Sequence, residues 1–144
     1  MRREVLGVRD GRVRFTLDNR SGWASRDLAR FFARGLKAYK VFTHVDIVVV
    51  PSPIRSRGCA QIGRGGRNGR AIVIAISSPS RFNLRRLARL FEHEAHHTKG
   101  QQHEDMSHDV LWSIGPTPAW AKVPIRWRGN TPPLSRKRGA RARG

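Results

Sequence analysis

Three histidines and a glutamate lie near residue 100 at spacings that suit a metal ion. His93 and His97 are four residues apart in a stretch with helical periodicity, so both imidazoles are expected on one face of a helix. Glu94 projects from the same turn, where its carboxylate can reach a water on the ion without becoming a ligand. Gly100 suits the end of the helix, after which the chain delivers His103 as a third ligand.

This donor set predicts catalytic zinc chemistry. Three neutral imidazoles leave the fourth position of a tetrahedral zinc ion open for water, which is the composition of catalytic and not of structural sites. Zinc lowers the pKa of such a water to about 7, and Glu94 can accept its proton as the water attacks a polarised carbonyl group. We therefore predict that His93, His97 and His103 bind Zn²⁺ and that Glu94 is the general base. Cys59 is the only cysteine, so neither an internal disulfide nor a cysteine-ligated zinc ribbon is expected.

The pattern His93-Glu94-x-x-His97-x-x-Gly100-x-x-His103 resembles the zinc-binding motif of the metzincin peptidases. Similarly spaced ligands occur in the WLM and SprT-like peptidases of DNA–protein crosslink repair. The resemblance implies an endopeptidase with a compact zincin fold, in which a helix backs a small sheet and the active-site helix lies beneath the cleft. It also implies that an edge strand, here the segment 58–63 or its neighbour, binds a protein or peptide substrate by β-augmentation.

Other polar residues near the motif are candidates for supporting roles. Glu104 and Asp105 can accept hydrogen bonds from ligand imidazoles, an arrangement often found around bound metals. His96 lies on another face of the helix, so we expect it in the core or in contact with the ligands. His108 suits either substrate orientation or the protein surface, and His44, just before a predicted strand, is expected to be structural.

The charge of the chain favours a polyanionic partner. Its 29 Lys and Arg against 10 Asp and Glu give a net charge of +19, and such a field attracts nucleic acid. Three tryptophans near basic residues, at 112, 120 and 127, suit either base stacking or a small core. The candidate nucleic-acid contacts are the basic residues of a Gly-rich turn and of the C-terminal segment: Arg64, Arg67, Arg70, Arg136, Lys137 and Arg138.

Two other functions fit the same residues. The first alternative is a nucleic-acid-binding or virion-associated protein whose zinc site is structural or inactive, since the charge alone accounts for such a partner. The second is a zinc hydrolase that acts on a non-peptide carbonyl or amide group, because the same ion and base can attack either.

Hydrophobic periodicity predicts an α+β domain with a small mixed sheet. Two alternating runs flank the turn dipeptide at 10–11 and predict a hairpin, and a helix is expected over 25–40 with Ser25 as its cap. β-branched runs at 45–50 and 71–76 predict central strands, and a short strand at 59–62 is expected to pair with the start of the second. A helix is expected to begin near Ser80 or Asn83, and a last strand-like piece covers 123–127.

The sequence divides into a domain and a tail. Residues 1–128 are expected to form one zincin-like metallopeptidase domain, whereas 129–144 are basic, poor in apolar residues and expected to be disordered. No apolar run approaches the roughly 20 residues that a membrane span requires, and no secretory hydrophobic region follows the first four residues. These features predict a cytoplasmic protein without membrane contact.

Overall fold

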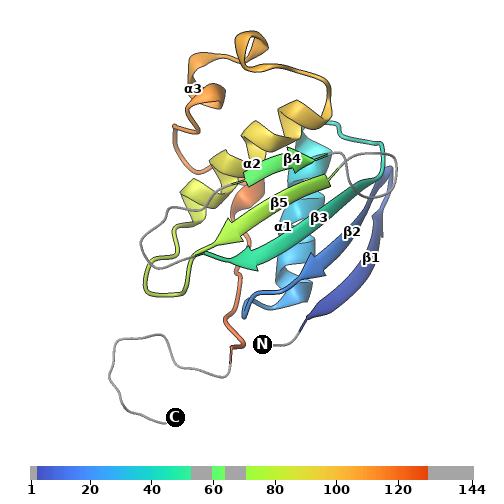
Figure 1. Cartoon of the computed structure of the whole chain (residues 1–144), viewed down its shortest axis with the longest axis vertical. Coiled ribbons are helices and arrows are strands. Elements are labelled where there is room, and N and C mark those ends of the chain that lie inside the picture. The colour runs from blue at the N-terminus through green and yellow to red at the C-terminus, as the bar shows by residue number, and fades with distance from the viewer. Residues whose placement is uncertain (1–2, 53–59, 64–70, 130–144) are drawn as a thin grey trace.

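The computed structural model describes residues 3–52, 60–63 and 71–129 of the chain. These residues form a five-stranded mixed sheet in the order β1-β2-β3-β5-β4, and two long helices pack beside it (Figure 1). The predicted α+β architecture with a small mixed sheet is confirmed. No helix within these ranges is long and apolar enough to cross a bilayer.

The N-terminal hairpin has the predicted form. β1 (Glu4–Asp10) pairs antiparallel with β2 (Val13–Asn19), and Gly11 takes a φ of +61° in the turn between them. Alternate residues of β2 enter the core, because successive strand residues point to opposite faces of a sheet. Those buried residues are Val13, Phe15 and Leu17.

Helix α1 (Ser25–Ala38) connects β2 to the parallel strand β3 (Val45–Pro51), which makes a β-α-β crossover. The prediction that Ser25 caps this helix was wrong. Ala24 occupies the N-cap position, and no side chain caps the helix there. The Ser25 hydroxyl instead accepts a hydrogen bond from Asn19 at 2.8 Å and donates one to Glu4. Two strand residues therefore bind the hydroxyl that was expected to cap the helix.

The short strand β4 (Ala60–Gly63) lies at one edge of the sheet. It pairs antiparallel with β5 (Ala71–Ile76), which runs parallel to β3, and the predicted hairpin is therefore confirmed. No other strand in the described ranges pairs with the far side of β4. The basic turn between these strands, with Arg64, Arg67 and Arg70, lies outside the described residues, as does Cys59.

Helix α2 (Leu84–Thr98) carries two of the three candidate metal ligands, His93 and His97. Asn83 caps its start, accepting a hydrogen bond from the Arg86 backbone at 3.0 Å. Phe91 is fully buried and packs against Phe32 of α1, with ring centroids 5.0 Å apart. Gly35 permits this approach, because a Cβ there would lie 2.7 Å from a Phe91 ring carbon. The core contacts of α1 therefore fix where α2 lies.

Between α2 and residue 129, the last described residue, the chain contains only short helical turns: η2 (His103–Asp105), α3 (His108–Leu111) and η3 (Ala119–Ala121). The strand predicted over 123–127 was wrong, since only an isolated bridge joins Trp127 to Trp23. Pro124 has no N–H group to give to a ladder, and the backbone N–H of Arg126 donates to Asp27 at 2.9 Å. The contacts predicted for Arg136, Lys137 and Arg138 fall in 130–144, outside the described residues.

Candidate metal centre

The three predicted ligands converge in space although His103 lies outside the helix that holds the other two. One potential ligand atom from each of His93, His97 and His103 lies within 4.8 Å of the others. Their ring centroids form a nearly equilateral triangle with sides of 4.9, 4.9 and 5.2 Å. These three histidines could hold a metal ion.

Gly100 turns the chain at the end of α2, as its place in the motif predicts. It adopts a φ of +91°, a conformation that residues with a Cβ rarely take. The Gly100 N–H donates to the His97 carbonyl at 2.9 Å, and the Gln101 N–H donates to the His96 carbonyl at 3.2 Å. These two bonds form a Schellman motif, which stops the helix and redirects the backbone toward His103.

Backbone carbonyls orient two of the three imidazoles. His93 Nδ1 lies 3.0 Å from the Val110 carbonyl oxygen, and His97 Nδ1 lies 2.8 Å from that of Gln101. Because a carbonyl oxygen only accepts, each Nδ1 must carry the hydrogen, and each Nε2 keeps its lone pair for a metal. The same arrangement orients many metal-bound histidines.

The separation of the ligand atoms suits a small ion after modest closure. Zn–N bonds of about 2.0 to 2.1 Å in a tetrahedral site place two nitrogens about 3.3 Å apart. No pair here is more than 4.8 Å apart, so each pair needs to approach by at most about 1.5 Å. His103 lies in the exposed turn η2, where rotation of its side chain meets little packing resistance.

Glu94 is a buried carboxylate beside this cluster. Glu94 is 4% exposed, and its Oε1 has no hydrogen-bond partner among the described residues. Burial raises the pKa of Glu94, and the charge of the nearby His97 opposes that shift. A carboxylate with a raised pKa and a free oxygen is a stronger proton acceptor near neutral pH than an ordinary surface glutamate.

The electrostatics of His93 also suit metal binding. Desolvation lowers its pKa, the hydrogen bond to Val110 opposes this, and the neighbouring His97 and His103 lower the pKa further. The ring is therefore neutral at a lower pH than a free histidine. A neutral imidazole is the form that binds a metal.

The acidic residues after the motif take places that differ from those predicted. Asp105 accepts a hydrogen bond from the Gln102 backbone at 2.9 Å, and the Gln102 side chain bonds back to the Asp105 backbone. This reciprocal cap stabilises the turn that carries His103, so Asp105 acts on the backbone and not on an imidazole. Glu104 is exposed and makes no side-chain hydrogen bond or ion pair with a described residue.

His96 lies behind the centre, in contact with the core. Its Nδ1 is 2.8 Å from the Glu92 carbonyl, and its ring lies 5.5 Å from that of Tyr39. Tyr39 in turn accepts a hydrogen bond from Trp120 at 2.9 Å. Of the two roles expected for His96, the structure gives it the core position. Trp120 likewise packs in the core, whereas Trp112 is 65% exposed.

His44 and His108 lie outside the three-histidine cluster. His44 lies just before β3, where its Nε2 is 3.1 Å from the Thr16 hydroxyl, which agrees with a structural role. His108 is exposed and contacts Asp109 at 3.3 Å.

The sequence did not indicate the carbonyls of Val110 and Gln101 as partners of the imidazoles, because backbone groups leave no signal in the residue types. Ser107, which caps α3, was the available hint that a helical turn there could approach His93.

No known family, characterised protein or solved structure matches this chain in sequence or structure comparisons. The chemistry assigned to the centre therefore depends on the geometry and electrostatics of its own residues.

Proposed function

We propose that this chain is a zinc-dependent endopeptidase with a zincin-like fold, in which His93, His97 and His103 bind Zn²⁺. The observation that carries the proposal is the convergence of three imidazoles beside a buried glutamate with an unpartnered oxygen. Imidazole is a ligand common to several metals, but an open site with three histidines is the composition found in catalytic zinc enzymes.

Glu94 supplies the acid–base chemistry. A zinc ion held by His93, His97 and His103 would polarise a carbonyl oxygen and lower the pKa of a water. Glu94 accepts a proton from the attacking water as a bond forms to the carbonyl carbon, and it later delivers that proton to the departing amine. Its burial favours the protonated state that exists between these two transfers, because the raised pKa makes protonation less costly.

The edge of β4 is the proposed binding site for the substrate backbone. Its far side has no partner strand in the described ranges, and β4 contacts α2, the helix that carries the ligands. An extended peptide can add to such an edge as a further strand through main-chain hydrogen bonds. This would hold a peptide bond beside Glu94 without requiring a particular side chain.

We also propose that nucleic acid localises the enzyme. The net charge of +19 supports this, because Lys and Arg that neutralise phosphates release counterions and so favour binding. The same charge supports the second candidate function, a nucleic-acid-binding protein with a structural or inactive zinc site. The two candidates differ in whether peptide bonds are cleaved.

A Glu94→Gln substitution tests the peptidase. The amide keeps the shape of the side chain but cannot accept a proton at neutral pH, and loss of a general base lowers turnover by about 10² to 10⁴. We expect Glu94→Gln to retain stoichiometric zinc while cleavage of a casein or fluorogenic peptide substrate falls by this factor. Zinc content is measured on the same samples by mass spectrometry.

Glu92→Gln is the matched control. Glu92 is also buried on α2, but its carboxylate forms an ion pair with Arg89 at 2.8 Å, whereas Glu94 Oε1 has no partner among the described residues. We expect this variant to keep its cleavage rate. Equal activity of wild type and Glu94→Gln would refute the mechanism, and a zinc-loaded wild type that binds DNA but cleaves nothing would favour the second candidate.

A further inference from the structure

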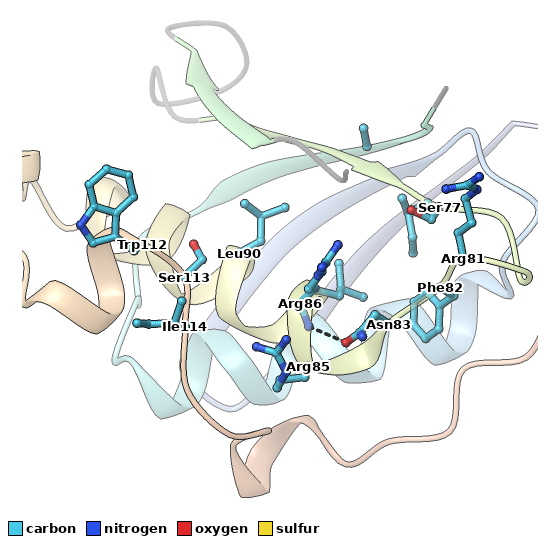
Figure 2. Close-up of a pocket in the computed structure, with 13 residues that line it drawn as sticks. Ser77, Arg81, Phe82, Asn83, Arg85, Arg86, Leu90, Trp112, Ser113 and Ile114 are labelled. Atoms are coloured by element: carbon cyan, nitrogen blue, oxygen red, sulfur yellow. Dashed lines mark hydrogen bonds between the residues drawn. The ribbon is translucent and has the colours of Figure 1, made fainter. Parts of the chain in front are cut away.

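A cavity of about 670 Å³ opens beside the N-terminal half of α2 (Figure 2). It is bounded by the end of β5, by α2 and by the segment that follows α3. Leu90 lines it and lies three residues before His93 and four before Glu94, so these positions are neighbours on the helix surface. The nearest part of the cavity wall on α2 is therefore about one helical turn from the candidate metal centre.

The opposite wall is tied to the same centre. Trp112 and Ile114 line the cavity just after α3, whose Val110 carbonyl bonds to His93. These two side chains are 65% and 41% exposed, although both are large and apolar. Together with Leu90 they form an apolar wall, and exposed apolar groups of this kind often mark a binding site.

The other end of the cavity is basic. Arg81, Arg85 and Arg86 line it, and none of its 13 lining residues is Asp or Glu. Arg85 donates to the Gly115 carbonyl at 3.3 Å, whereas the side chains of Arg81 and Arg86 make no hydrogen bond or ion pair with a described residue. Figure 2 shows Arg86 projecting from α2 into the middle of the cavity, with Arg81 beyond it near Ser77.

We propose that this cavity selects an acidic side chain of the peptide substrate, with Arg86 as its main partner and Arg81 as a second cation. The proposal rests on the proposed peptidase function. A guanidinium recognises a carboxylate through two parallel hydrogen bonds, and the start of α2 adds a positive helix dipole. The apolar wall of Leu90, Trp112 and Ile114 then receives a hydrophobic side chain next to the acidic one.

A nucleic-acid phosphate carries the same charge, but the observations favour a peptide. A phosphate backbone brings many charges and little apolar surface, whereas Leu90, Trp112 and Ile114 give this cavity an apolar wall. Leu90 in its wall also lies one turn from Glu94, so a peptide side chain bound here would lie close to the proposed general base.

The test uses zinc-loaded full-length protein and pairs of fluorogenic peptides that differ only by Glu or Gln, with the change moved along the peptide. We expect wild type to cleave the Glu peptide about five-fold faster in kcat/KM at one position, the factor given by about 1 kcal/mol. Arg86→Gln should remove this preference. Arg26→Gln, which removes the same charge from the exposed surface of α1, should retain it.

Binding of the same peptides to Glu94→Gln protein, measured by fluorescence anisotropy, separates the two proposals. Cleavage by the wild type without any preference for Glu peptides would refute the acidic pocket but not the peptidase. Absence of cleavage, together with tighter binding of Glu peptides that Arg86→Gln abolishes, would support the pocket and refute the peptidase. If Arg86→Gln weakened binding of a single-stranded oligonucleotide while Glu and Gln peptides bound equally, the cavity would be a phosphate site and the proposal would fail.

Discussion

Replacing Gly100 by alanine should weaken zinc binding more than it weakens the fold. A Cβ at this position would meet nothing within 4 Å, so the substitution causes no collision. Its whole cost comes from the φ of +91°, which penalises a residue with a side chain by about 1 to 2 kcal/mol. The result therefore measures how strongly the proposed zinc site depends on this one backbone conformation.

The cost should appear mainly in the affinity for zinc. Without metal, the end of α2 can relieve the strain by opening the two hydrogen bonds of the Schellman motif, whereas binding through His103 requires them closed. A penalty of about 1 to 2 kcal/mol corresponds to zinc binding that is weaker by about 5- to 30-fold. Competition against a chromophoric chelator measures this change, and thermal unfolding without zinc measures the effect on the fold.

Gly11→Ala is the matched control for this prediction. Gly11 also has a positive φ, +61°, and a Cβ there would likewise meet nothing within 4 Å, but it lies in the hairpin between β1 and β2. We expect this variant to lose some stability and to bind zinc as wild type does. Unchanged zinc affinity in Gly100→Ala, or an equal loss in Gly11→Ala, would refute the role assigned to the turn.

Two further predictions concern the core and the charge. Burial raises the pKa of Tyr39, the only tyrosine, to about 12, so its tyrosinate absorbance should rise near pH 12 in the folded protein and near pH 10 once unfolded. Because the unfolded chain releases this proton at a lower pH, the free energy of unfolding should fall as pH rises from about 10 to 12, and this fall should be smaller in Tyr39→Phe. An ordinary titration near pH 10 in the folded protein would contradict the burial of this hydroxyl. The affinity for DNA should fall linearly with the logarithm of salt concentration, and removal of residues 130–144 should make the slope shallower, whereas an affinity independent of salt would exclude phosphate contacts.

Much of the fold could be predicted because its strands and helices carry strong periodic signals. The hairpin around Gly11, the β-branched strands β3 and β5, and the amphipathic helices α1 and α2 each bury one regular set of side chains. The predictions of the helix cap and of the last strand failed because hydrogen bonds to residues of other segments replaced the local ones. Ser25 bonds to strand residues and not to its helix, and Asp27 takes the N–H of Arg126 that a strand would have used.

The ligands of the candidate centre could be predicted because the spacing of His93, His97, Gly100 and His103 encodes local geometry. A helix places the first two on one face, and glycine permits the turn that returns the third. The groups that orient the ligands could not be predicted in the same way. The Val110 carbonyl depends on the packing of α3, and the cavity at Arg86 depends on how the segment 112–114 crosses α2.

Metal loading of histidine variants tests the central claim most directly. Zinc content by mass spectrometry and the visible absorption of the cobalt-substituted protein should show one tetrahedral metal per chain in wild type and in His96→Ala, whose ring bonds behind the centre. Substitution of His93, His97 or His103 by alanine should remove the metal and its tetrahedral spectrum. If these three variants bound zinc as wild type does, or if wild type bound none, the three histidines would not form the proposed centre.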